Sequence, residues 1–141
     1  VVDYSTLYTS NVTLSTTGGT SATASKVKIN NIDYDAIKAG SNKKAGVWCV
    51  TVPAGTTTLH LHALAWSGEN NSLTISGADC TPDSISLTAN TGISGTATTY
   101  TLSSVVNDYF KISLNGIVAN TKLTFTVSGG KRFVVWGVNA E

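Results

Sequence analysis

The chain has 141 residues, a formal net charge of +1 and only 12% charged residues, against about 25% in an average soluble protein. We expect one domain over residues 1–141, and the near-zero net charge gives no reason to expect a nucleic-acid or acidic-polymer partner. No apolar run approaches the roughly 20 residues of a membrane-spanning helix.

Alternation of apolar and polar residues recurs along the first half of the chain, and helical periodicity is absent from it. Turn residues separate the predicted strands, which cover 11–16, 26–29, 32–37, 45–52, 57–66 and 72–76. The Asn30-Asn31 dipeptide predicts a turn between the second and third of them. The longest strand places one row of side chains opposite another, with Leu59, Leu61, Ala63 and Ala65 against His60, His62, Leu64 and Trp66.

The second half continues this pattern, with predicted strands at 84–89, 98–106, 109–114, 122–127 and 133–138. Pro82 argues against a central strand over 77–83. Residues 133–138 are apolar on both faces, so we expect a central strand that is covered on both sides. Residues 1–10 are expected to be a loose lead-in or an edge strand.

Short strands at this spacing predict an all-β fold, namely an antiparallel β-sandwich of two sheets. A jelly-roll order of strands is preferred, and an immunoglobulin-like order is the second possibility. The richness in Thr, Ser and Asn is typical of secreted and cell-surface proteins. Because the chain lacks methionine, even at position 1, we expect a processed product or a piece of a larger extracellular polypeptide.

His60 and His62 are the residues with the clearest potential for metal chemistry. Residues two apart on a strand face the same way, so both imidazoles could reach one metal ion. A zinc site needs at least a third ligand, and no spacing typical of metal sites occurs in the chain. We therefore expect no metal and no cofactor, with both histidines on a half-polar sheet face.

Trp66 follows the histidines on the same predicted face and precedes a polar loop that contains Glu69, Asn70 and Asn71. Sugar sites combine a ring that stacks on a pyranose with carboxylate and amide groups that bind hydroxyls. We predict a glycan site with Trp66 as the platform, flanked by His60 and His62. The alternative is that Trp66 belongs to the core, as we expect for Trp48 and Trp136.

Other titratable residues give weaker indications. Asp33 and Asp35 share a strand face and could bind calcium, although a solvated edge strand explains them more simply. Lys43-Lys44 and Lys131-Arg132 are expected to be loop charges that favour solubility. Cys49 and Cys80 could form a disulfide, but a buried thiol is the preferred interpretation of Cys49. No motif presents a catalytic serine and titratable groups are few, so we do not expect an enzyme.

Several segments resemble the jelly-roll accessory modules of secreted and surface-anchored proteins of gut-type bacteria. The resemblance rests on 34–40, on 46–56, on Leu59-His60-Leu61-His62-Ala63 with Ala65-Trp66, and on the ending 130–138. It implies a β-sandwich that is appended to a larger protein and that binds glycans or acts as a spacer.

The leading hypothesis is a monomeric, non-catalytic carbohydrate-binding module that binds a glycan through Trp66, His60, His62, Glu69, Asn70 and Asn71. The alternative is a structural or adhesion module that spaces or docks a neighbouring domain or protein. Such a module predicts a polar surface without a concave aromatic site.

Overall fold

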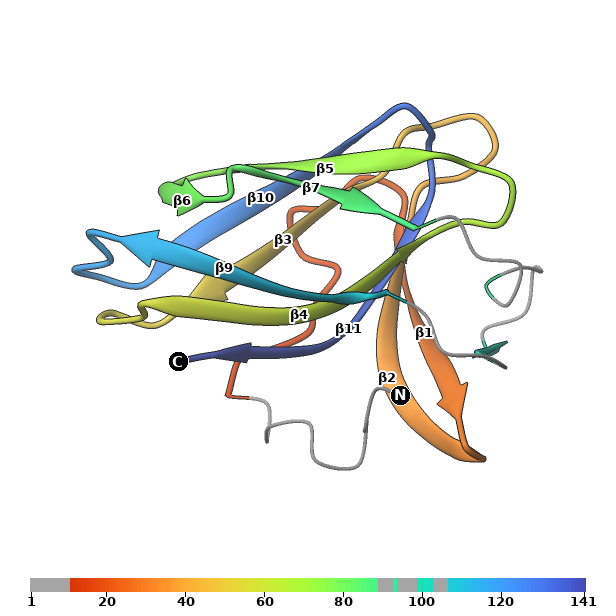
Figure 1. Cartoon of the computed structure of the whole chain (residues 1–141), viewed down its shortest axis with the longest axis horizontal. Helices are drawn as coiled ribbons and strands as arrows, with labels where there is room; N and C mark the ends of the chain where they lie inside the picture. Colours follow the sequence, from red (N-terminus) through yellow and green to blue (C-terminus); the bar gives the residue numbers. More distant parts are fainter. Residues whose placement is uncertain (1–10, 89–92, 94–98, 103–106) are drawn as a thin grey trace.

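The computed structural model describes residues 11–88, 93, 99–102 and 107–141. Its strands form two sheets that are packed as layers (Figure 1). The larger sheet has the order β6 (Asp79–Thr81), β9 (Tyr109–Asn115), β4 (Thr58–Ala65), β11 (Phe133–Ala140), β2 (Ile32–Ala39), β1 (Ala22–Ile29) and β8 (Thr99–Thr101). The smaller sheet has the order β3 (Val47–Val52), β10 (Thr121–Ser128), β5 (Asn71–Ser76) and β7 (Ser84–Leu87).

This architecture confirms the predicted all-β sandwich. Neighbouring strands are antiparallel except β1 and β8, which are parallel. The choice between a jelly-roll and an immunoglobulin-like order stays a prediction. Within the described part of the chain, no helix is long and apolar enough to cross a membrane.

The main core lies between the two sheets and follows from the alternation in the sequence. Each strand turns every second side chain inward, and burying apolar surface in this way stabilises the pair of layers. The fully buried members of this core come from both sheets and include Trp48, Val52, Leu59, Leu61, Leu73, Ile112, Leu123 and Phe125.

A second apolar cluster covers the outer face of the larger sheet. Leu64, Val134 and Trp136 point to this face and are fully buried. The cluster also contains Val27, Ile29, Ala36, Trp66, Ile93, Tyr100 and Leu102. The larger sheet is therefore apolar on both sides of its centre.

β11 confirms the prediction of a central strand. It lies between β4 and β2 and pairs antiparallel with both. Phe133 and Val135 enter the main core, whereas Val134 and Trp136 enter the outer cluster. The run without alternation in the sequence thus marks a central strand with apolar side chains on both of its faces.

The Asn30-Asn31 turn is confirmed, and it connects β1 to β2 in full register from Ile29 opposite Ile32 to Ala22 opposite Ala39. Both asparagines have positive φ, 52° and 63°. Two-residue hairpins that match the twist of their strands require positive φ at both positions, and asparagine tolerates it better than most residues do.

One predicted strand is absent from the structure, and one short strand forms where none was predicted. Residues 11–16 form no strand, although Val12 is buried and Leu14 packs against the core. The reason is that Asn11 binds the end of β11 through its side chain, with Nδ2 donating to the Ala140 carbonyl (2.7 Å) and Oδ1 accepting from the Ala140 amide (2.9 Å). Within 77–83 the short edge strand β6 pairs with β9 and ends just before Pro82.

The acidic residues Asp33 and Asp35 lie on β2, which is not an edge strand of the sheet. β11 pairs only with residues 36–39 of β2, so both acids lie where β1 is the sole neighbour. There Asp33 pairs with Lys28 (3.5 Å) and Asp35 with Lys26 (3.0 Å). The carboxylates are thus engaged by lysines across the hairpin.

The strand predicted over 98–106 is described only at 99–102, and the predictions for residues 1–10 lie outside the described residues.

Candidate functional site

Trp66 does not present an open ring. The side chain lies directly after β4, in the outer cluster, and is only 6% exposed. Lys38 Nζ lies 4.5 Å and Arg132 Cζ 4.9 Å from the centroid of the indole, and Tyr100 meets the indole edge-on at 5.4 Å. Because two cations and an aromatic ring cover the indole, the predicted role of Trp66 as a stacking platform does not fit its surroundings.

The loop after Trp66 does reach a concave surface. An open groove of about 740 Å³ lies between three loops at the end of the sandwich where β2, β4 and β10 finish. Glu69 and Asn70 line it, together with Asn42, Ala45, Gly68 and residues 127–132. Two of the six predicted residues therefore lie side by side at a hollow in the surface.

Glu69 is held in place by the β10–β11 turn. Its Oε1 accepts a hydrogen bond from the Lys131 amide (3.1 Å), and its Oε2 accepts one from Arg132 Nε (3.2 Å). The carboxylate is about one-fifth exposed. A fixed, partly exposed carboxylate can accept further hydrogen bonds through its remaining lone pairs.

Asn71 has a structural role instead. It is 8% exposed, and its Nδ2 donates to the Arg132 carbonyl (2.8 Å). This bond fastens the start of β5 to the start of β11. Gly129 makes the close approach possible, because a Cβ there would lie 2.8 Å from the Asn70 carbonyl oxygen and φ is +86°.

The groove also gathers positive charge. Lys131 Nζ donates to the Asn42 carbonyl (3.3 Å), which brings the β2–β3 loop against the β10–β11 turn. Burial lowers the pKa of Lys38, and the nearby Arg132 guanidinium lowers it further, whereas Glu69 acts in the opposite direction. Lys38 and Arg132 therefore repel one another across the indole.

His60 lies near the other end of β4, on the outer face as predicted. Its Nε2 donates to the Glu141 carboxylate (2.6 Å), and its Nδ1 lies 2.7 Å from the Tyr109 hydroxyl. Burial raises the pKa of Tyr109, and the Glu141 carboxylate raises it further. Both ring nitrogens of His60 are thus engaged by neighbouring side chains.

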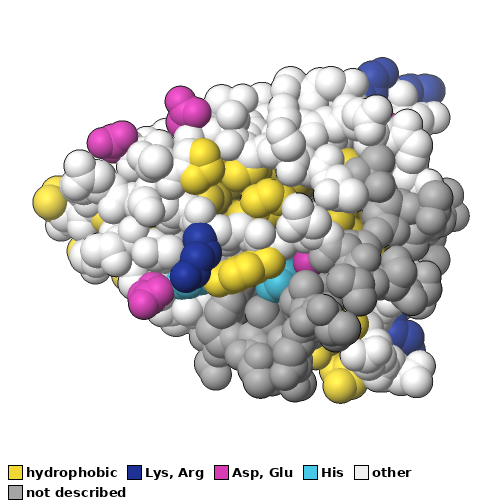
Figure 2. Space-filling model, viewed as in Figure 1, with side chains coloured by type: hydrophobic (Ala, Val, Ile, Leu, Met, Phe, Trp, Pro, Cys, Tyr) yellow, Lys and Arg dark blue, Asp and Glu magenta, His cyan; other side chains and the backbone are white. Residues whose placement is uncertain are grey.

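His62 faces the same way but is 1% exposed and lies within the apolar outer face. Its Nδ1 donates to Asp108 (2.9 Å), a carboxylate that is fully buried. The imidazole stacks with Tyr109 (5.0 Å) and with Trp136 (5.8 Å). The expectation of a half-polar, solvated face is therefore wrong for His62, because aromatic rings and a buried carboxylate surround it. On the face drawn in Figure 2, histidine side chains lie among hydrophobic and acidic ones.

The six predicted residues thus fall into two places. Six residues of extended chain separate His60 from Trp66, which is about 20 Å along a strand. Glu69 and Asn70 line the groove, Trp66 and Asn71 contact Arg132 at its wall, and the histidines form a separate cluster with Tyr109. Among the residues that the structure describes, no three His, Cys, Asp or Glu side chains are grouped so as to hold a metal ion.

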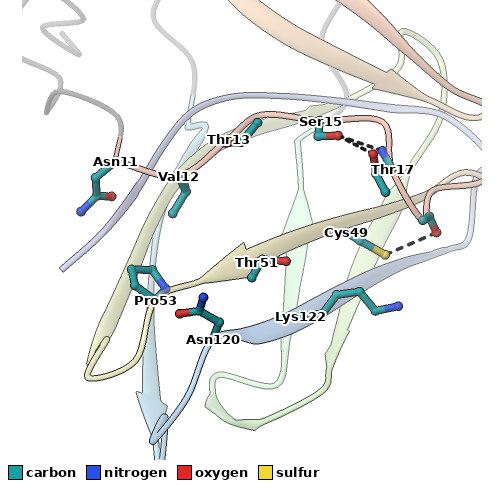
Figure 3. A pocket seen from close by; sticks show the side chains of 11 residues that line it. Asn11, Val12, Thr13, Ser15, Thr17, Cys49, Thr51, Pro53, Asn120 and Lys122 are labelled. Atoms are coloured by element: carbon teal, nitrogen blue, oxygen red, sulfur yellow. Dashed lines mark hydrogen bonds between the residues drawn. The ribbon is translucent and has the colours of Figure 1, made fainter.

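A second hollow of about 510 Å³ lies where the segment 11–18 passes over β3 and β10 (Figure 3). Several of its polar side chains bind within the protein: the amide of Asn11 binds Ala140, and Ser15 binds Thr17 through their hydroxyls (2.9 Å). Cys49 at its wall donates to the Gly18 carbonyl (3.4 Å). No carboxylate is among the described lining residues of this hollow, whereas the loop groove contains Glu69.

The two cysteines are unpaired and buried. This agrees with the preferred interpretation of Cys49 as a small buried side chain, which is 5% exposed. Burial raises the pKa of the Cys80 thiol, and the carboxylates of Asp79 and Asp83 raise it further.

Comparison with known proteins finds no match to this chain among family models, curated proteins or solved structures. The resemblance to accessory modules of bacterial surface proteins therefore stays a prediction.

The residues that complete the loop groove and the histidine cluster were not identified from the sequence. Arg132 and Lys131 were interpreted as solubility charges, yet they hold Glu69, which lies 62 or more positions earlier in the chain. Asp108, Tyr109 and Glu141 lie 46, 49 and 81 positions from the histidines that they bind. No local pattern identifies such partners, because they meet only through the pairing of β4 with β9 and β11.

Proposed function

We propose that the protein is a non-catalytic carbohydrate-binding module of a secreted or cell-surface protein, and that the loop groove is its glycan site. The observation that supports this most is the Glu69 carboxylate, which is fixed by Lys131 and Arg132 at the wall of an open groove. Carboxylate and amide groups in such positions bind sugar hydroxyls.

The remaining lining of the groove suits the same ligand. Asn70 is exposed, and Asn42 adds a neutral amide from the β2–β3 loop. No aromatic side chain is among the described lining residues. Without ring stacking, affinity depends on hydrogen bonds, so we expect weak binding, on the order of micromolar to millimolar.

Binding to a glycan array tests this proposal. Asn70→Ala removes an exposed amide at the groove, and Asn120→Ala is the matched control at the second hollow. We expect Asn70→Ala to weaken retention about five-fold, which corresponds to one hydrogen bond of about 1 kcal/mol, with unchanged melting temperature. Retention of no glycan by the wild type, or equal losses in both variants, would contradict the proposal.

The second candidate is a spacer or adhesion module. Among the described residues, the large hydrophobic side chains that are exposed are Ile32, Tyr109 and Val118, and they lie on three different elements. Scattered apolar residues of this kind form no docking patch. Of the two roles in this second candidate, a spacer is therefore favoured over a docking module. A spacer predicts that the protein retains no glycan of the array.

A further inference from the structure

Positive charge is concentrated at the loop end of the sandwich. Five of the nine Lys and Arg residues of the chain lie there, on the end of β2, the β2–β3 loop and the β10–β11 turn: Lys38, Lys43, Lys44, Lys131 and Arg132. Lys and Arg side chains project at the upper right in Figure 2, which is where these loops lie in Figure 1. The net charge of +1 therefore hides a strongly uneven distribution.

The other described cations do not share this environment. Lys26 and Lys28 are paired with Asp35 and Asp33 across the hairpin. In contrast, Glu69 is the sole carboxylate among the described residues of the three loops around the groove. One carboxylate thus faces five cations at this end of the molecule.

The charges nearest the groove are forced together by the fold. Lys38 and Arg132 both lie within 5 Å of the Trp66 centroid (4.5 and 4.9 Å). The indole attracts both cations through its ring electrons, but it does not cancel their mutual repulsion. Since Glu69 already binds Arg132 and the Lys131 amide, a second anion at the groove would relieve the repulsion that remains.

We propose that the groove binds an acidic saccharide, whose carboxylate or sulfate group pairs with the cations of this cluster. The inference rests on the proposed glycan-binding function and adds the charge of the ligand to it. The neutral amides of Asn42 and Asn70 suit the hydroxyls that lie between the acidic groups of such a chain.

The same features disfavour a nucleic acid. Proteins that bind nucleic acids are usually strongly basic over the whole domain, whereas this chain has a pI of about 7.9. Single strands are also bound by stacking bases on exposed aromatic rings, and the described groove lining contains none.

Three forms of one polymer test the inference: dextran, carboxymethyl-dextran and dextran sulfate, each immobilised, with a DNA duplex as a fourth probe. Lys43→Gln/Lys131→Gln removes two exposed charges on the loops around the groove, and Lys111→Gln/Lys122→Gln removes two exposed charges elsewhere. We expect the wild type to bind the charged dextrans at least ten-fold more tightly than dextran. The groove variant should lose about five-fold and the control less than two-fold, with binding weakened by salt.

Each outcome has a distinct meaning. Equal retention of the neutral and charged dextrans, or equal losses in the two variants, overturns the acidic preference while glycan binding stands. DNA bound as tightly as dextran sulfate overturns the saccharide assignment in favour of a general polyanion surface. If neither the charged dextrans nor any array glycan is retained, both the inference and the proposed function fail.

Discussion

Trp66 shows how position in a strand can mislead about exposure. It stands on the same face as the histidines, as alternation predicts, but this face is covered by the outer apolar cluster. Its indole packs against Lys38 and Arg132, and so it acts on the groove through Arg132, which lines it. Trp66 therefore contributes more to the stability of the loop end than to direct contact with a ligand.

Replacing Trp66 tests this structural role. Trp66→Ala should lower the free energy of unfolding by about 3–5 kcal/mol, because it leaves a cavity under the loops. Urea denaturation measures the change, and Trp66→Phe should be milder because the ring retains part of the contacts. A Trp66→Ala protein as stable as the wild type would mean that the indole is exposed.

The thiols give a second test at the scale of single residues. Because the pKa of Cys80 is raised by burial and by Asp79 and Asp83, less thiolate is present at pH 8 than for an ordinary cysteine, and the thiolate is the reactive form. We expect slow reaction of the native protein with a thiol reagent. Two equivalents should react after denaturation without reductant. Recovery of no thiol after denaturation would indicate a disulfide and contradict the structure.

At the scale of elements, the β1–β2 hairpin depends on its asparagine turn. Both central residues have positive φ, which is unfavourable for a β-branched side chain by roughly 1–2 kcal/mol. We expect Asn31→Val to destabilise the protein by about this amount and Asn31→Gly to be neutral or stabilising. The matched control is Asn120→Val in the β9–β10 connection, because Asn120 itself does not have positive φ. Similar losses at both positions in urea denaturation would rule out the turn geometry as the cause.

The elements also show what alternation can and cannot predict. It identified β3, β4, β9 and β10 because each places a continuous row of apolar side chains in the core. β11 was predicted instead from its lack of alternation, since both of its faces are apolar. Alternation failed at 11–16. Val12 and Leu14 pack against the core there, but the segment forms no strand and is attached to the end of β11 through the side chain of Asn11. The local sequence thus indicates which side chains are buried, whereas the hydrogen-bond partners of a segment depend on residues far away in the chain.

At the scale of the whole molecule, the sandwich brings three loops together that are far apart in sequence. Glu69 and Asn70 could be predicted as polar loop residues, but their neighbours Asn42, Lys131 and Arg132 come from loops on other strands. The order of strands decides which loops meet, and periodicity contains no information on that order. The positive charge around the groove could not be predicted for the same reason, because the loop lysines are scattered along the sequence and were interpreted as surface charges.

Mapping the binding surface by NMR tests the proposed site most directly. Titration of isotope-labelled protein with short dextran sulfate oligomers should shift the amide signals of residues 42–45, 68–70 and 128–132, which surround the groove. Signals of Tyr109 and of the second hollow around Thr51 should stay in place. Shifts concentrated at either of those two places, or no shifts at millimolar oligomer, would contradict the assignment of the loop groove.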